Sequence, residues 1–173
     1  MNRSTLLVFA ASLAAACGLQ AQSTNALIAE AKRNYTAVKN NLTKAAEKMP
    51  EENYSFQPVP EIRTFGALLA HIADAQTGLC SSVHGERKRG DANTKTAKAD
   101  LVAALAASFA ECDAAFDSLT DANFQEAVGQ RTKLGTLIYA TTHDSEEYGY
   151  MAVYFRLKGI VPPSSEGGSR GGR

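Results

Sequence analysis

Apolar side chains recur at gaps of three and four residues along four segments of this chain, which is the repeat of an amphipathic α-helix. The segments cover residues 25–49, 65–83, 101–119 and 132–158. No segment alternates apolar and polar residues as a half-exposed strand does. Helices of this length must bury their apolar stripes against one another. The sequence therefore predicts an all-α fold, a four-helix bundle.

The ends of these segments carry residues that begin or end helices. Pro50 ends the first segment, because proline lacks a backbone N–H donor and restricts the residue before it. Thr64 is the expected N-cap of the second segment. Gly159 is the expected C-cap of the fourth segment, and Pro162-Pro163 prevents the helix from continuing.

The first residues have the features of a secretory signal peptide. Arg3 supplies a positive charge, and an apolar run follows over residues 6–16 before the chain turns polar. We expect cleavage after Ala21. The alternative is processing as a lipoprotein at Cys17, although the residue three positions earlier is small where such sites prefer a large aliphatic one.

This interpretation divides the chain into three parts. Residues 1–21 are the signal peptide, residues 22–163 are the bundle, and residues 164–173 are a Gly- and Ser-rich tail that we expect to be disordered. The mature chain has no second apolar run long enough to cross a bilayer. We therefore expect an exported protein, periplasmic or secreted, with no transmembrane helix in its mature form.

Charge excludes some classes of partner. The chain has 18 basic and 18 acidic residues, and removal of the signal peptide takes away one basic residue, so the mature charge is 17 minus 18, or −1. Such a balance offers no attraction to nucleic acid or to an anionic membrane. We expect a small-molecule substrate that the sequence does not identify. Bundles of this kind also pair through a helix face, so a homodimer is an open alternative.

Two cysteines, Cys80 and Cys112, remain after cleavage, and both lie on predicted helices. In an oxidising compartment they could form a disulfide that pins neighbouring helices together. The alternative is a pair of unbridged thiols that fill the core.

The strongest candidates for a functional site are His143 and Glu147. They are four residues apart, so on a helix both side chains leave the same, mainly apolar, face. A carboxylate on an apolar face requires a cation, a hydrogen-bond donor or a metal ion. His71, on the second predicted helix, is the other candidate, and our hypothesis is that the fold brings His71, His143 and Glu147 together.

Each candidate has a simpler alternative. His71 could be a half-buried helix residue bonded to Asp74. His143 could be packed beside Tyr139 and bonded to Glu147. Glu147 could form an ion pair with His143 or Arg156 in an ordinary bundle. If the metal site exists, Asp74 could instead accept a hydrogen bond from His71 and fix the tautomer of the imidazole.

Two stretches of the chain resemble signatures of the DinB/YfiT-like superfamily. The first is residues 54–71, Tyr-Ser-Phe-Gln-Pro-Val-Pro-Glu-Ile-Arg-Thr-Phe-Gly-Ala-Leu-Leu-Ala-His. The second begins with His-Asp-Ser-Glu-Glu-Tyr-Gly at residues 143–149 and runs on to Ser165. The resemblance covers essentially the whole mature chain, which makes it similar to an exported member of the DinB family.

The resemblance implies a four-helix bundle with a divalent metal ion held by three histidines. His71 and His143 occupy two of those positions, and the third falls on Glu147, where this sequence departs from the pattern. Two histidines and a glutamate suit zinc with a fourth position open, and they also suit non-haem iron. We expect the cofactor to be a divalent zinc, nickel or iron ion.

Two functions follow as hypotheses. The first is a metal-dependent hydrolase or transferase; the resemblance implies relatives that use a low-molecular-weight thiol as co-substrate, in the cytosol, so the export signal argues against a direct transfer of that activity. The alternative is a non-catalytic envelope bundle for stress protection or partner binding, with a degenerate metal site.

Overall fold

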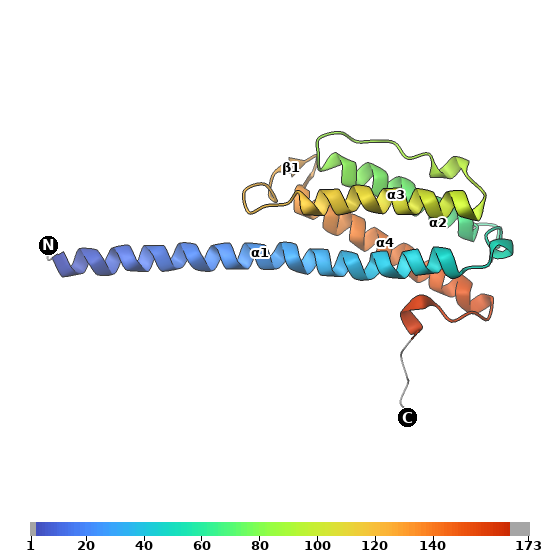
Figure 1. The fold of residues 1–173 in the computed structure, drawn as a ribbon, viewed down its shortest axis with the longest axis horizontal. Helices are drawn as coiled ribbons and strands as arrows, with labels where there is room; N and C mark the ends of the chain where they lie inside the picture. The colour runs from blue at the N-terminus through green and yellow to red at the C-terminus, as the bar shows by residue number, and fades with distance from the viewer. Residues whose placement is uncertain (1–2, 167–173) are drawn as a thin grey trace, which may run out of the picture.

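The computed structural model describes residues 3–166 and shows four α-helices among them (Figure 1). The prediction of an all-α four-helix bundle is confirmed. The helices are α1 (Arg3–Lys48), α2 (Phe65–Ser82), α3 (Lys98–Asp117) and α4 (Lys133–Leu157).

Short elements lie in the connections between the helices and after α4. Three 3₁₀ turns are η1 (Glu51–Asn53), η2 (Ala92–Thr94) and η3 (Pro163–Ser165). Strands β1 (Ala127–Val128) and β2 (Arg131–Thr132) form a small antiparallel hairpin that pairs Ala127 with Thr132 and Val128 with Arg131. The hairpin leads directly into α4.

Helix α2 packs against both α3 and α4, and α1 packs against α4 and, less extensively, α3. The pairing of α2 with α4 brings together two segments that are about 70 residues apart in the sequence, which matters for the site described below. The N-terminal half of α1 extends beyond the other three helices (Figure 1).

The start of α1 differs from expectation, because the helix continues back to Arg3 rather than beginning near residue 25. The additional residues are rich in alanine and leucine, which are strong helix formers. The apolar region of a signal peptide can itself be helical, so the proposed cleavage stays a prediction. Within the residues that the structure describes, no helix is long and apolar enough to cross a membrane.

The predicted helix ends agree with the structure. Thr64 accepts a hydrogen bond from the Ala67 N–H at 3.1 Å, as predicted. Thr132, which was not predicted as a cap, accepts one from the Gly135 N–H at 3.0 Å at the start of α4. Gly159 follows α4 with a φ of +70°, a left-handed conformation that favours glycine.

The core is formed by large apolar side chains from all four helices, as the periodicity predicts. The largest of those fully buried are Leu42, Met49, Phe65, Leu69, Ile72, Leu101, Leu105, Leu137, Met151 and Phe155. Burial of this set removes each helix's apolar stripe from water, which is the main driving force for the bundle.

The residues after α4 turn back onto the bundle. Pro163 is buried, the Ser164 N–H donates to the Tyr148 hydroxyl at 2.8 Å, and Glu166 pairs with Lys48. Residues 164–166 thus differ from the expected disordered tail, because their backbone and charge find partners on α4 and α1. The rest of that tail lies outside the described residues.

Candidate metal centre

Two histidines from different helices meet at the contact between α2 and α4. His71 lies on α2 and His143 on α4, and their Nε2 atoms are 3.1 Å apart. Both rings are partly buried, with 34% of the His71 side chain and 18% of the His143 side chain exposed. Both imidazole rings are therefore accessible to solvent, although most of the surface of each ring is buried.

Glu147 completes the cluster from one turn further along α4. Its Oε1 atom is 3.5 Å from the Nε2 of His71 and 3.5 Å from the Nε2 of His143. Four ligands in a tetrahedron around zinc, at bond lengths of about 2.0–2.1 Å, lie about 3.3–3.4 Å from one another. The three observed separations match one face of such a tetrahedron and leave the fourth position free for another ligand.

The second carboxylate oxygen of Glu147 gives an independent indication of a cation. Oε2 is buried and has no hydrogen-bond partner among the described residues. An ionised carboxylate in this condition is costly unless a charge compensates it. The donor set of two imidazoles and one carboxylate therefore fits a divalent metal ion, and these three residues would hold it.

A network of buried polar side chains lies on the Nδ1 side of His143. Its Nδ1 atom is 3.5 Å from Oδ1 of Asp144, which is 2% exposed. The Gln76 amide donates to Oδ2 of Asp144 at 2.6 Å and accepts from the Ser108 hydroxyl at 2.6 Å. With Asp144 accepting at Nδ1, the proton of neutral His143 is held there and Nε2 keeps its lone pair for the centre.

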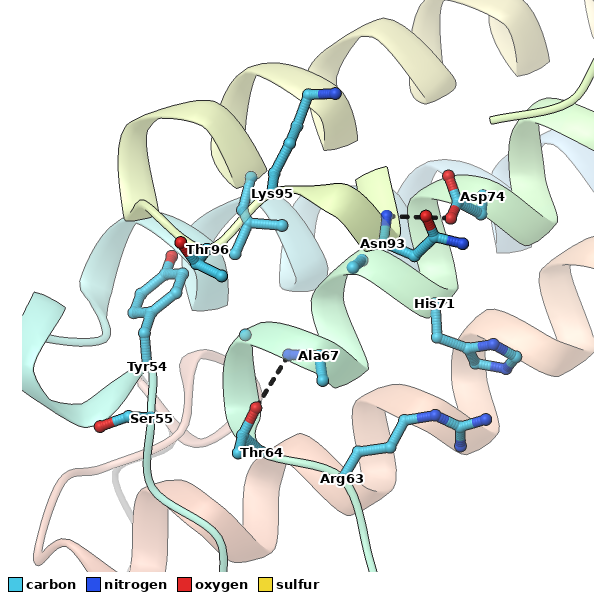
Figure 2. A pocket seen from close by; sticks show the side chains of 13 residues that line it. Tyr54, Ser55, Arg63, Thr64, Ala67, His71, Asp74, Asn93, Lys95 and Thr96 are labelled. Atoms are coloured by element: carbon cyan, nitrogen blue, oxygen red, sulfur yellow. Dashed lines mark hydrogen bonds between the residues drawn. The ribbon is translucent and has the colours of Figure 1, made fainter. Parts of the chain in front are cut away.

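Asp74 does not have the role that the sequence predicts for it. Its two carboxylate oxygens accept the backbone N–H groups of Ala92 at 2.8 Å and Asn93 at 3.1 Å. Figure 2 shows the His71 side chain pointing away from Asp74. The reason is the path of the loop after α2: it returns beside Asp74, and the carboxylate binds the otherwise unpaired N–H groups at η2.

The two imidazoles have opposite electrostatic environments. The Asp144 hydrogen bond raises the pKa of His143 above its ordinary 6.5, although burial opposes the effect. Burial lowers the pKa of His71, and the positive charge of Arg63 lowers it further. Burial also raises the pKa of the Asp144 carboxyl, against the hydrogen bonds from His143 and Gln76. At neutral pH His71 is therefore the neutral imidazole that a metal ion requires.

Two cavities of about 690 Å³ each adjoin the cluster. His71 lines the first, and Glu147 lines the second. Arg63 lines both cavities and so lies at the boundary between them. Each volume is within the range of small-molecule sites.

A disulfide joins Cys80 of α2 to Cys112 of α3, with their Cα atoms 4.9 Å apart. Cys112 also lies against the main chain of Gln76, with 4.0 Å between its sulfur and the Gln76 carbonyl oxygen. The bridge therefore adjoins the residues that support His143.

Sequence reasoning missed the support for His143, although a signal was present. Gln76 and Ser108 are polar residues within the apolar stripes of their helices: Gln76 is four residues after Ile72, and Ser108 is three after Leu105. A polar side chain in such a position must find a buried partner, which could have pointed to a network.

Comparison with known proteins agrees with the fold. A family model for the DinB superfamily matches residues 34–151, about two thirds of the chain. The matched region contains His71, His143 and Glu147. No curated protein matches the chain.

Proposed function

Because the chain belongs to the DinB superfamily, we propose that it binds one divalent metal ion through His71, His143 and Glu147. The observation that carries the proposal is the convergence of three ligand atoms within 3.1–3.5 Å of one another beside a buried carboxylate oxygen without a partner. Zinc, nickel and iron are the candidates, because two imidazoles and a carboxylate suit each of them.

The proposed activity is that of a hydrolase or transferase acting on a small molecule. A bound metal ion would supply Lewis acidity and lower the pKa of a coordinated water to about 7. The protein's own contribution is to orient His143 through Asp144, to keep Glu147 away from bulk water, and to leave two cavities open beside the ligands.

The first experiment measures metal content. The mature protein is incubated with zinc, nickel, manganese and iron, desalted, and measured by mass spectrometry. We expect about one equivalent of one of these metals. Less than roughly a tenth of an equivalent of all of them would contradict the proposal.

The second experiment uses His143→Ala. A ligand that binds only the native state raises its melting temperature, so the metal should stabilise the wild-type protein and not the variant. His84→Ala is the matched control, because His84 is exposed in the loop after α2 and lies in a different part of the molecule. Equal stabilisation of both variants by the metal would show that His143 is not a ligand.

A non-catalytic envelope bundle is the second candidate function. It is favoured by the departure at Glu147, where the resemblance leads one to expect a third histidine. The two functions separate on the metal-content measurement, since the second requires no ion at the centre.

The proposed location is the periplasm or the medium, reached through removal of residues 1–21. The apolar run behind Arg3 supports this. Lipoprotein processing at Cys17 is the alternative, and a homodimer is a proposal that size-exclusion chromatography with light scattering would test.

A further inference from the structure

Arg63 lies beside the candidate metal centre without being part of it. It is the last residue but one before α2, and it lines both cavities that adjoin the cluster. Figure 2 shows its guanidinium group extending toward the ring of His71. The positive charge also contributes to the lowered pKa of His71, which agrees with a short separation.

The backbone of Arg63 is fixed by its neighbours. Its carbonyl oxygen accepts the hydroxyl of Tyr154, a buried residue of α4, at 2.5 Å. The next residue, Thr64, caps α2. The backbone of Arg63 is therefore fixed relative to α2 and α4, the helices that carry the candidate metal ligands. From this position its side chain lines both cavities.

The Arg63 guanidinium has no counter-charge within the part of the chain whose side chains are described. Among the side chains of residues 26–166, no carboxylate forms an ion pair with Arg63 and no acceptor bonds to its side chain. Other cations of the molecule do have such partners: Lys39 pairs with Asp113, Lys88 with Glu111, and Lys133 with Glu126. Arg63 is thus available for an anionic group in the cavity.

The second cavity combines this cation with an apolar wall. Ile62, Tyr150 and Val153 line it and are 41%, 52% and 53% exposed, so large apolar surfaces face solvent next to Glu147. Leu68 and Tyr154 form the deeper wall. Exposed apolar surface gathered at one cavity is typical of a binding site for a ligand with an apolar body.

We propose that Arg63 binds the carboxylate of an amphipathic small-molecule substrate whose apolar body lies along Ile62, Tyr150 and Val153. A guanidinium offers two parallel N–H donors that match a carboxylate. The second cavity also contains Glu61 and Glu147, whose charges disfavour a doubly charged phosphate more than a singly charged carboxylate. The proposal rests on the proposed function, because it names the substrate class of the same centre.

Three probes of one shape separate the charge from the apolar body: phenylbutyrate, phenylbutanamide and phenylbutylamine. Their binding is measured by isothermal titration calorimetry on the mature protein, once after treatment with a chelator and once loaded with zinc. In both states we expect the wild-type protein to prefer the carboxylate over the amide by about tenfold, because the charged acceptor pairs with the guanidinium.

Variants assign the preference to one side chain. Arg63→Gln should bind the acid and the amide about equally, and Arg63→Lys should show an intermediate preference, because an ammonium does not bind both oxygens in parallel. Arg89→Gln is the matched control: it removes one positive charge from an exposed position that lines neither cavity, and it should behave as the wild type.

Several results would overturn the proposal. These are equal binding of acid and amide by the wild type, a preference for the amine, no binding of any probe into the millimolar range, or an acid preference that survives in Arg63→Gln. If that preference survives only in the zinc-loaded protein, the carboxylate binds the metal instead; if it survives in both states, another group of the protein binds it.

A parallel zinc titration of Arg63→Gln keeps this test separate from the metal proposal. We expect its zinc affinity to stay within a few-fold of the wild type, because Arg63 is not a ligand. An Arg63-dependent acid preference in protein that binds no metal would support this inference while the metal function fails.

Discussion

Asp144 is a buried carboxylate next to His143, one of the candidate metal ligands. It bonds to the Gln76 amide on one side and faces Nδ1 of His143 on the other. A carboxylate or carbonyl behind a ligating histidine fixes the tautomer and makes the ligand more basic. Asp144 is therefore a positioning residue in our interpretation of the centre.

Asp144→Asn should weaken zinc binding by about 10- to 100-fold, the usual effect of losing such a partner. The measurement is a competition titration with a chromophoric chelator. Asp74→Asn is the matched control, because Asp74 holds the loop at η2 and not His71. It should lower the melting temperature while leaving zinc affinity within a few-fold. Comparable losses of affinity in the two variants would contradict these assignments.

The opposite pKa shifts of the two histidines predict how zinc affinity depends on pH. Protons compete with the metal for each neutral imidazole. As pH falls, His143 is protonated first, since its pKa is above 6.5 and that of His71 is below 6.5. Zinc affinity should therefore begin to fall while the pH is still above 6.5, and a second, steeper loss should follow at lower pH.

Titrations of the wild type between about pH 5 and 8 would measure this dependence. In Asp144→Asn the hydrogen bond that raises the pKa of His143 is weakened, so the first loss should move to lower pH. An unchanged onset in that variant would show that Asp144 does not act on His143.

At the scale of elements, the disulfide connects α2, which carries His71, to α3. Its two cysteines are 32 residues apart in the sequence. Closing a loop of that length in the unfolded chain is worth about 3–4 kcal/mol in the chain-entropy description. The bridge should thus account for a large share of the stability of a bundle of this size.

Cys80→Ser/Cys112→Ser should lower the free energy of unfolding by about 3–4 kcal/mol, measured by urea denaturation of the mature protein. The wild type with and without a reducing agent provides the internal control. Titration of denatured, unreduced wild-type protein should find no reactive thiol. Two reactive thiols would show that the bridge is absent and that the cysteines only fill the core.

The loop between α2 and α3 approaches α2 closely at Gly90. A methyl group added there would lie 2.8 Å from the Cα of Asp74, a separation that requires the backbone to move. Gly90→Ala should therefore cost about 1–3 kcal/mol, seen as a lower melting temperature.

Gly149→Ala is the control with the opposite expected sign. Gly149 is an exposed residue within α4, and a methyl group there meets no atom within 4 Å. Alanine is the better helix former by about 1 kcal/mol, so the melting temperature should rise. A stabilising effect of Gly90→Ala would mean that the loop does not follow the described path.

At the scale of the whole molecule, the bundle and the proposed export signal use different parts of the chain. The buried core is formed by residues from Ala31 onward, whereas the proposed export would depend on residues 1–21. We predict that protein recovered from its natural compartment begins at Gln22. Intact mass measurement decides this: a full-length mass would contradict cleavage, and a lipid-modified chain beginning at Cys17 would establish the alternative.

The helices and the shared face of His143 and Glu147 could be predicted from the sequence because both depend on local spacing. An apolar repeat of 3.6 residues defines which face of each helix is buried, whatever its neighbours are. The separation of four residues places His143 and Glu147 on one face in any helix. Thr64 and Gly159 mark helix ends for reasons that lie within a few residues of each.

Only the tertiary structure decided which side chains support these candidate ligands. Asp74 is three residues after His71, and Asp144 directly follows His143. The sequence alone does not show which of these two carboxylates bonds to its neighbouring histidine. The path of the loop across Asp74 satisfies that carboxylate, while the packing of α2, α3 and α4 buries Asp144 against Gln76 and Ser108. Hydrogen-bond partners in a core come from distant parts of the chain, and a buried polar group must take the partner that packing brings to it.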